Sequence, residues 1–63
     1  MEHGSPQEYS QQAQTLYRSG DLAGAAQAFG QAVDAYALAG DVLMAAEMKN
    51  NQAVALLKGG NAE

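Results

Sequence analysis

The chain has 63 residues, enough for one small domain, and it carries a net charge of −4 and no cysteine, which excludes disulfides and thiolate zinc sites. Its three basic residues, Arg18, Lys49 and Lys58, are too few for a nucleic-acid-binding patch or for attraction to an anionic membrane, and no apolar run approaches the ~20 residues that span a bilayer. The absence of cysteine fits a reducing compartment and predicts a cytoplasmic protein, and 14 alanines favour closely packed helices over a thin core.

The first predicted helix covers residues 6–19 and follows a flexible N-terminus of residues 1–5. Ser5 is a favourable N-cap, Pro6 suits the first helical position, and Glu8 completes a capping box. Gly20 then ends the helix in the left-handed conformation. One side of this helix is apolar, with Tyr9, Ala13, Leu16 and Tyr17. The other side is rich in glutamine, which indicates either a solvated face or a polar groove that hydrogen-bonds a peptide.

The second predicted helix covers residues 22–39, between an N-cap at Asp21 and a terminating glycine at Gly40. Its apolar residues recur at the spacing of an amphipathic helix, which predicts that they face the core. These residues are Leu22, Ala25, Ala26, Phe29, Ala32, Val33 and Tyr36. Gly24 and Gly30 lie inside this helix, where they either permit close approach of another helix or are tolerated at the surface.

The third predicted helix covers residues 42–58, after an N-cap at Asp41, and residues 61–63 form a flexible C-terminus. It is apolar on two sides, so it needs neighbours on both. One side consists of Val42, Ala46, Ala53, Leu56 and Leu57, and the other of Met44, Met48 and Ala55. The second helix can cover one side. The Met44, Met48 and Ala55 side is then either hidden by the first helix or exposed as a docking strip, for which adaptable methionine side chains are well suited.

The turns recur every twenty residues, at Gly20-Asp21, Gly40-Asp41 and Gly60-Asn61, and each pair predicts a helix end followed by a helix start. Residues 12–21 also align with residues 52–61, with four identical positions. The third helix therefore repeats the first. The period of 40 is typical of helical solenoids, and we expect one and a half repeats in a single all-α module over residues 6–60.

This pattern resembles tetratricopeptide repeats (TPRs) in a longer variety of about 40 residues per repeat. The match rests on small and apolar residues in the first helix and its copy, on the Gly-Asp turns, and on small and aromatic residues in the second helix; these are Ala13, Leu16, Ala53, Leu56, Gly20, Asp21, Ala25, Phe29, Ala32, Gly40, Asp41, Ala46 and Asn51. The chain departs from the family where a large apolar residue is expected, because Gln12 and Gln52 stand there.

The resemblance implies a concave groove lined by the first helix of each repeat, at Ser10, Gln11, Gln14, Glu47, Asn50, Asn51 and Val54. Gln14 and Asn51 would supply amide contacts to a peptide. A clamp for a peptide's C-terminal carboxylate is not expected, because the basic residues it needs are absent. The chain is also similar to the three-helix microtubule-interacting-and-transport (MIT) domains, although the short Gly40-Asp41 join and the few charges of the third helix differ from that family.

Residues for catalysis are missing. The one histidine, His3, lies near the N-terminus, the serines have no evident His/Asp partners, and no ligand set for a metal or cofactor is present. We therefore expect a non-enzymatic TPR-like scaffold or adaptor that binds a protein or peptide. The candidate binding residues are Gln11, Gln14, Met44, Glu47, Met48, Asn50, Asn51 and Ala55. The alternative is a structural subunit that acts by homo-oligomerisation, because one and a half repeats fall short of the three that usually confer independent stability.

Overall fold

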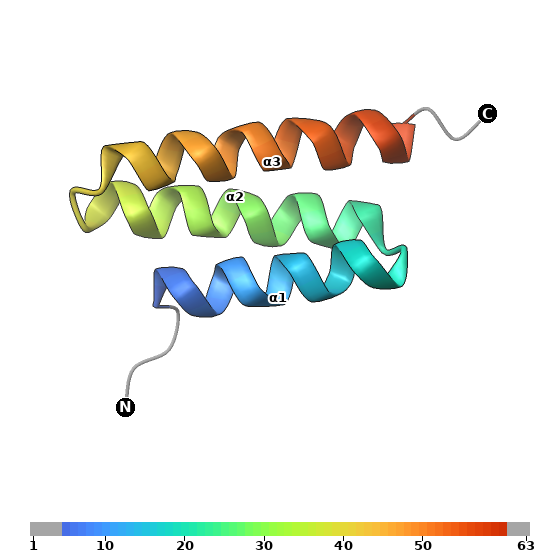
Figure 1. Ribbon diagram of the computed structural model, residues 1–63, viewed down its shortest axis with the longest axis horizontal. Helices are drawn as coiled ribbons and strands as arrows, with labels where there is room; N and C mark the ends of the chain where they lie inside the picture. The colour runs from blue at the N-terminus through green and yellow to red at the C-terminus, as the bar shows by residue number, and fades with distance from the viewer. Residues whose placement is uncertain (1–4, 61–63) are drawn as a thin grey trace.

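The computed structural model describes residues 5–60, which form three antiparallel helices joined by two tight turns (Figure 1). The helices are α1 (Pro6–Ser19), α2 (Leu22–Leu38) and α3 (Val42–Gly60). No strand occurs within these residues, so the predicted all-α, three-helix fold is confirmed. The segments predicted to be flexible, 1–5 and 61–63, lie outside the described residues except for Ser5.

The helices lie side by side in one layer, with α2 in the middle and α1 and α3 on its two sides (Figure 1). The molecule extends over 39 × 23 × 12 Å, so it is thinnest across the layer of helices. This arrangement gives α2 two helical neighbours. It leaves the side of α3 that points away from α2 without a neighbour among residues 5–60.

The predicted N-caps are present at all three helix starts. Ser5 Oγ accepts a hydrogen bond from the Glu8 N–H at 3.3 Å. Asp21 Oδ1 accepts from the Gly24 N–H at 3.0 Å, and Asp41 Oδ1 accepts from the Met44 N–H at 3.2 Å. Each such cap satisfies an N–H group that has no partner within the helix, and contributes about 1 kcal/mol.

The first two glycine turns also form as predicted, whereas the third does not. Gly20 and Gly40 have φ values of +93° and +81°, the left-handed conformation that ends a helix. Gly60 has no positive φ and is instead the last residue of α3, so this helix runs two residues beyond its predicted end. A Cβ on Gly59 would lie 3.2 Å from Leu22 Cβ, so the absence of a side chain there lets the last turn of α3 approach the start of α2. Asn61, predicted to start another helix, lies outside the described residues.

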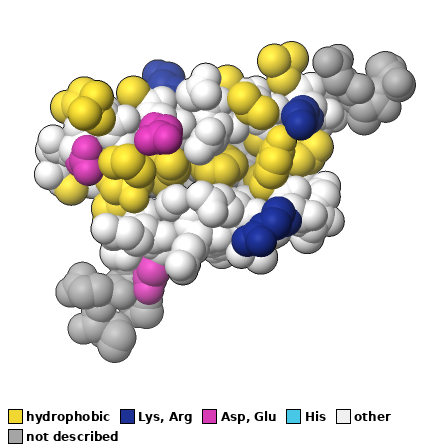
Figure 2. All heavy atoms as spheres, in the orientation of Figure 1, with side chains coloured by type: hydrophobic (Ala, Val, Ile, Leu, Met, Phe, Trp, Pro, Cys, Tyr) yellow, Lys and Arg dark blue, Asp and Glu magenta, His cyan; other side chains and the backbone are white. Residues whose placement is uncertain are grey.

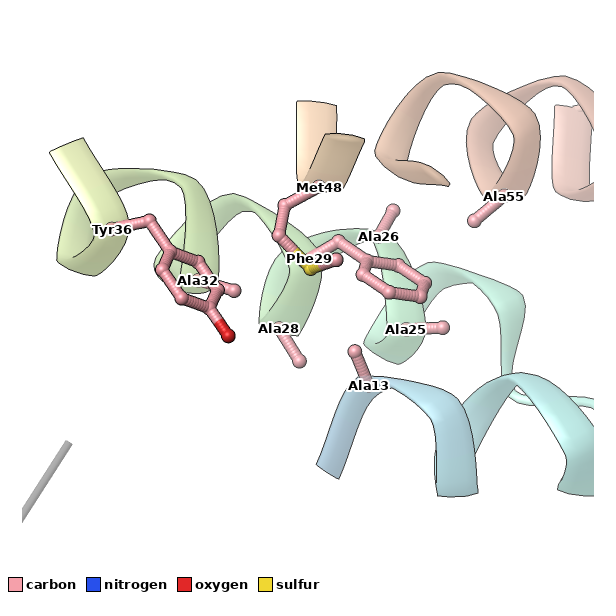
Figure 3. Close-up of a cluster of buried hydrophobic side chains, with 9 residues drawn as sticks. All are labelled: Ala13, Ala25, Ala26, Ala28, Phe29, Ala32, Tyr36, Met48 and Ala55. Carbon is pink, nitrogen blue, oxygen red and sulfur yellow. The ribbon is translucent and has the colours of Figure 1, made fainter. Parts of the chain in front are cut away.

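The core is thin because most of its side chains are alanines (Figure 3). Its buried residues are Ala13 from α1, Ala25, Ala26, Ala28, Phe29, Ala32 and Tyr36 from α2, and Met48 and Ala55 from α3. The predicted apolar stripe of α2 is therefore largely confirmed, with Leu22 and Val33 half-buried and Ala28 added. Small residues bring the helices together, and three large side chains fill the spaces between them.

One polar contact links α3 to the backbone of α2. Gln52 Nε2 donates a hydrogen bond of 3.1 Å to the Ala26 carbonyl oxygen, which can accept a second bond beside its helical one. A Cβ on Gly30 would lie 2.6 Å from Gln52 Nε2, so only glycine leaves room for this amide. The contact gives a physical reason both for a glycine inside α2 and for a glutamine where the TPR pattern has a large apolar residue.

Candidate functional site

The side of α3 that was predicted as a possible docking strip packs in the core, and the other apolar side is exposed. Met48 is 3% exposed, Ala55 is fully buried and Met44 is half-buried. Met48 and Ala55 extend from α3 towards α2 (Figure 3). The prediction that Met44, Met48 and Ala55 form an exposed docking strip is therefore wrong. The flexible methionine side chain fills the irregular space beside the aromatic and alanine residues of α2, which a branched side chain would fill less well.

The other apolar side of α3 is the open one. Leu43 is 83% exposed, Val42 74%, Leu57 65% and Leu56 57%. α1 does not cover these residues, because it lies on the far side of α2 (Figure 1). We call this surface the outer face of α3; it consists of Val42, Leu43, Ala46, Lys49, Asn50, Ala53, Leu56 and Leu57, all of which are exposed.

A shallow groove crosses one face of the layer between α1 and α3. Gln14 and Tyr17 of α1 form one wall, Asn51 and Val54 of α3 form the other, and Phe29 of α2 forms the floor. The groove encloses about 220 Å³. The space-filling view shows apolar side chains gathered in a band along the middle of the layer (Figure 2).

The two amides predicted to meet a peptide do lie in this groove. Gln14 and Asn51 face each other across its apolar floor, and neither side chain makes a hydrogen bond within residues 5–60. Each amide therefore retains its donors and its acceptor for a ligand. The groove is otherwise apolar, so it combines hydrogen-bonding groups at its walls with a hydrophobic contact surface at its base.

The remaining predicted groove residues lie elsewhere on the surface. Gln11 lies in a polar depression along α1 that Gln12, Gln14 and Arg18 also line, so Gln14 borders both this depression and the groove. Glu47 and Asn50 are exposed on α3, and neither lines the groove that contains Asn51. The structure therefore brings Asn51 together with Gln14, but not with Gln11, Glu47 or Asn50.

Two groove residues, Tyr17 and Phe29, and the neighbouring Lys58 did not stand out in the sequence as binding residues. Tyr17 and Phe29 belong to apolar stripes, and such stripes predict core positions without distinguishing the side chains at the edge of the core. Lys58 lies outside the groove, and its Nζ lies 5.6 Å from the centre of the Tyr17 ring. This cation–π contact, worth about 0.5–1 kcal/mol at an exposed site, links α3 to α1 at one end of the groove.

A larger depression, of about 540 Å³, lies between the start of α2 and the end of α3. Its titratable lining residues are Asp21, which already caps α2, and Lys58. Within residues 5–60 no group of three histidine, cysteine, aspartate or glutamate side chains is placed to hold a metal ion. None of α1, α2 and α3 is both long and apolar enough to cross a membrane.

No protein-family model matches the sequence, and no curated protein and no solved structure is significantly similar to the chain. The resemblance to TPRs therefore rests on the residues and turns described above.

Proposed function

We propose that this chain is a non-enzymatic protein-interaction module of TPR-like type, which binds a short peptide segment of another protein in the groove between α1 and α3. The observation that carries the proposal is the pair of amides, Gln14 and Asn51, on opposite walls of a groove with an aromatic floor.

The groove suits a peptide because its groups match the two parts of a peptide chain. An amide side chain can donate to a backbone carbonyl and accept from a backbone N–H at the same time. Gln14 and Asn51 lie on the two walls, so one extended segment can reach both. An apolar side chain of the peptide would then rest on Phe29, Tyr17 and Val54, removing apolar surface from water.

The charges near the groove favour an internal segment over a chain end. No lysine or arginine lines the groove itself, and the nearby Lys58 is engaged with the Tyr17 ring. A terminal carboxylate is held best by two or more converging cations or backbone N–H groups, which the groove lacks. A peptide segment without a terminal charge fits the site better.

The test is to pan a phage-displayed library of random peptides against the full chain and to titrate the selected peptide by NMR. The chemical-shift changes should centre on Gln14, Tyr17 and Asn51. Asn51→Ala should weaken binding about 10-fold or more, because it leaves a buried backbone group of the peptide without its partner.

The matched control is Asn50→Ala, which removes the same amide one residue away, at an exposed position outside the groove. It should leave peptide affinity unchanged. The proposal fails if no peptide is selected, or if Asn50→Ala and Asn51→Ala weaken binding equally.

A further inference from the structure

The outer face of α3 has a symmetric order of residues. Its members form pairs whose residue numbers add up to 99: Val42 with Leu57, Leu43 with Leu56, Ala46 with Ala53, and Lys49 with Asn50. Large apolar residues therefore lie at both ends of the face, alanines lie inside them, and a polar pair lies at the centre. The space-filling view shows two groups of apolar side chains along the outer edge of α3 with a basic side chain between them (Figure 2).

The same residues follow the spacing of helices that pack along their length. Val42, Lys49 and Leu56 are seven residues apart, as are Leu43, Asn50 and Leu57, and as are Ala46 and Ala53. A seven-residue repeat keeps one seam of a helix against a partner helix. The face is also held outward, because the buried Met48 and Ala55 fix the opposite side of α3 against α2.

We propose that the outer face of α3 binds the same face of a second copy of this chain, with the two α3 helices antiparallel and a two-fold axis passing between Lys49 and Asn50. The symmetric order makes the face complementary to itself in this arrangement. Val42 and Leu43 of one copy lie against Leu57 and Leu56 of the other, and Ala46 lies against Ala53. Such a pairing is the isologous interface that a closed dimer requires.

The small and polar residues at the centre set the geometry of this dimer. Ala46 and Ala53 allow the two helix backbones to approach closely. At the two-fold axis Lys49 of each copy lies beside Asn50 of the other, where its ammonium group can donate to the amide oxygen while its alkyl stem covers apolar surface. One polar pair in an otherwise apolar interface fixes how the two α3 helices align along their length. Any shift of one helix along the other would bury Lys49 or Asn50 against a leucine.

A helix like α2 from another protein fits this face less well. By the 40-residue repeat, Ala53, Leu56 and Leu57 correspond to Ala13, Leu16 and Tyr17, which pack around α2. This correspondence covers the C-terminal half of the face only, because Lys49 stands where α1 has Tyr9. A second copy of α3 covers both halves with apolar side chains, so we assign the face to self-association.

The dimer should be reversible. The paired segment from Val42 to Leu57 is about 24 Å long at 1.5 Å per residue, and one helix on each side buries less than a standard protein interface. A dissociation constant on the order of 10–100 µM is expected for an interface of this size.

Cysteine pairing tests the arrangement directly, because the natural chain contains no cysteine. In the proposed dimer residue 46 lies level with residue 53 of the other copy, whereas the two copies of residue 46 are about 10 Å apart along the helix axes. A disulfide requires Cα atoms within about 7 Å. Ala46→Cys and Ala53→Cys chains should therefore oxidise slowly when alone. In an equal mixture at 200 µM they should form at least nine mixed disulfides for each same-residue one.

The control is Ala37→Cys, at an exposed position on α2 away from the outer face. In an equal mixture of Ala37→Cys and Ala46→Cys chains, mixed and same-residue disulfides should form in equal amounts. This is the ratio that random collision produces. Equal amounts of mixed and same-residue disulfides in the 46/53 mixture would overturn the proposal, and so would rapid cross-linking of Ala46→Cys alone, which indicates parallel helices.

Sedimentation equilibrium gives the second measurement. Leu43→Glu and Leu56→Glu should each weaken dimerisation at least tenfold without unfolding the monomer, because both side chains are exposed. Leu38→Glu is the matched control, since Leu38 is 90% exposed but lies at the end of α2, outside the outer face of α3. A natural chain that remains monomeric up to 1 mM, or a dimer that Leu43→Glu leaves intact, would overturn the proposal. Asn51→Ala in the groove should not affect dimerisation, so the two proposals can fail separately.

Discussion

α1 and α3 share four identical residues when residues 12–21 are aligned with residues 52–61, yet the two helices use different sides to contact α2. Ala13 of α1 is fully buried, whereas its counterpart Ala53 on α3 is exposed. In the other direction, Met48 and Ala55 of α3 are buried, whereas their counterparts on α1, Glu8 and Thr15, are polar and exposed. The comparison shows that a local pattern determines which sides of a helix are apolar, and that the position of the neighbour determines which of them is buried.

This difference follows from the order of the helices in the layer. α1 has one apolar side, and this side is covered by α2, the helix against which α1 mainly packs. Within residues 5–60, α3 packs mainly against α2 but has two apolar sides, so one of them remains open. The inner side, with Met48 and Ala55, packs against α2, and the outer side, with the valine and leucines, is exposed.

The largest expected effect comes from placing a charge on the inner side of α3. Met48→Glu should destabilise the domain by about 3 kcal/mol or more, because it removes a buried side chain and places a carboxylate in an apolar core. Since small domains are only marginally stable, this variant should lose most of its helical circular dichroism at 25 °C. Leu57→Glu, measured at low micromolar concentration, should keep its helicity. A well-folded Met48→Glu chain would contradict the packing of α3.

A matched pair of substitutions compares the two copies at equivalent positions. Ala13→Leu should destabilise by about 1–3 kcal/mol, because the added atoms overfill a packed site. Ala53→Leu should change stability by less than about 0.5 kcal/mol, as is usual for an exposed position. Urea denaturation of both variants at low concentration measures the difference. Equal effects at the two positions would mean that α1 and α3 use the same side.

The smallest expected effect concerns the contact between Gln52 and Gly30. Gly30→Ala alone raises the helix propensity of α2 but displaces the Gln52 amide from the Ala26 carbonyl oxygen. The two effects on the free energy of unfolding should nearly cancel. In a Gln52→Ala chain, Gly30→Ala should instead stabilise by about 1 kcal/mol. A double-mutant cycle from thermal unfolding measures this coupling. Additive effects would show that Gly30 does not serve to make room for Gln52.

The sequence predicted the turns and the helix starts well, because each depends on residues close together in the chain. The Gly20-Asp21 and Gly40-Asp41 pairs carry both the left-handed conformation and the N-cap. The end of α3 was not predicted, because α3 continues through Gly59 and Gly60, although a glycine pair favours a helix end. The choice between the two sides of α3 could not be predicted either, since both are apolar at helical spacing and the choice depends on how well each fits α2.

The candidate groove was predictable in part for a similar reason. The resemblance to TPRs predicted that Gln14 and Asn51 line one groove, and both residues line the groove between α1 and α3. Phe29 at the floor and Lys58 beside Tyr17 depend on the lateral spacing of three helices. No local pattern in the sequence encodes that spacing.

The most direct test of the packing of α3 is a nuclear Overhauser spectrum of the natural chain, recorded on an isotope-labelled sample with contacts between copies filtered out. The side-chain methyl of Met48 and the methyl of Ala55 should show contacts within one chain to residues of the α2 core, and the methyls of Leu56 and Leu57 should show none to that core. Contacts from Leu56 and Leu57 to the α2 core within one chain, with none from Met48, would mean that α3 is rotated and that its outer face is the one that packs inside.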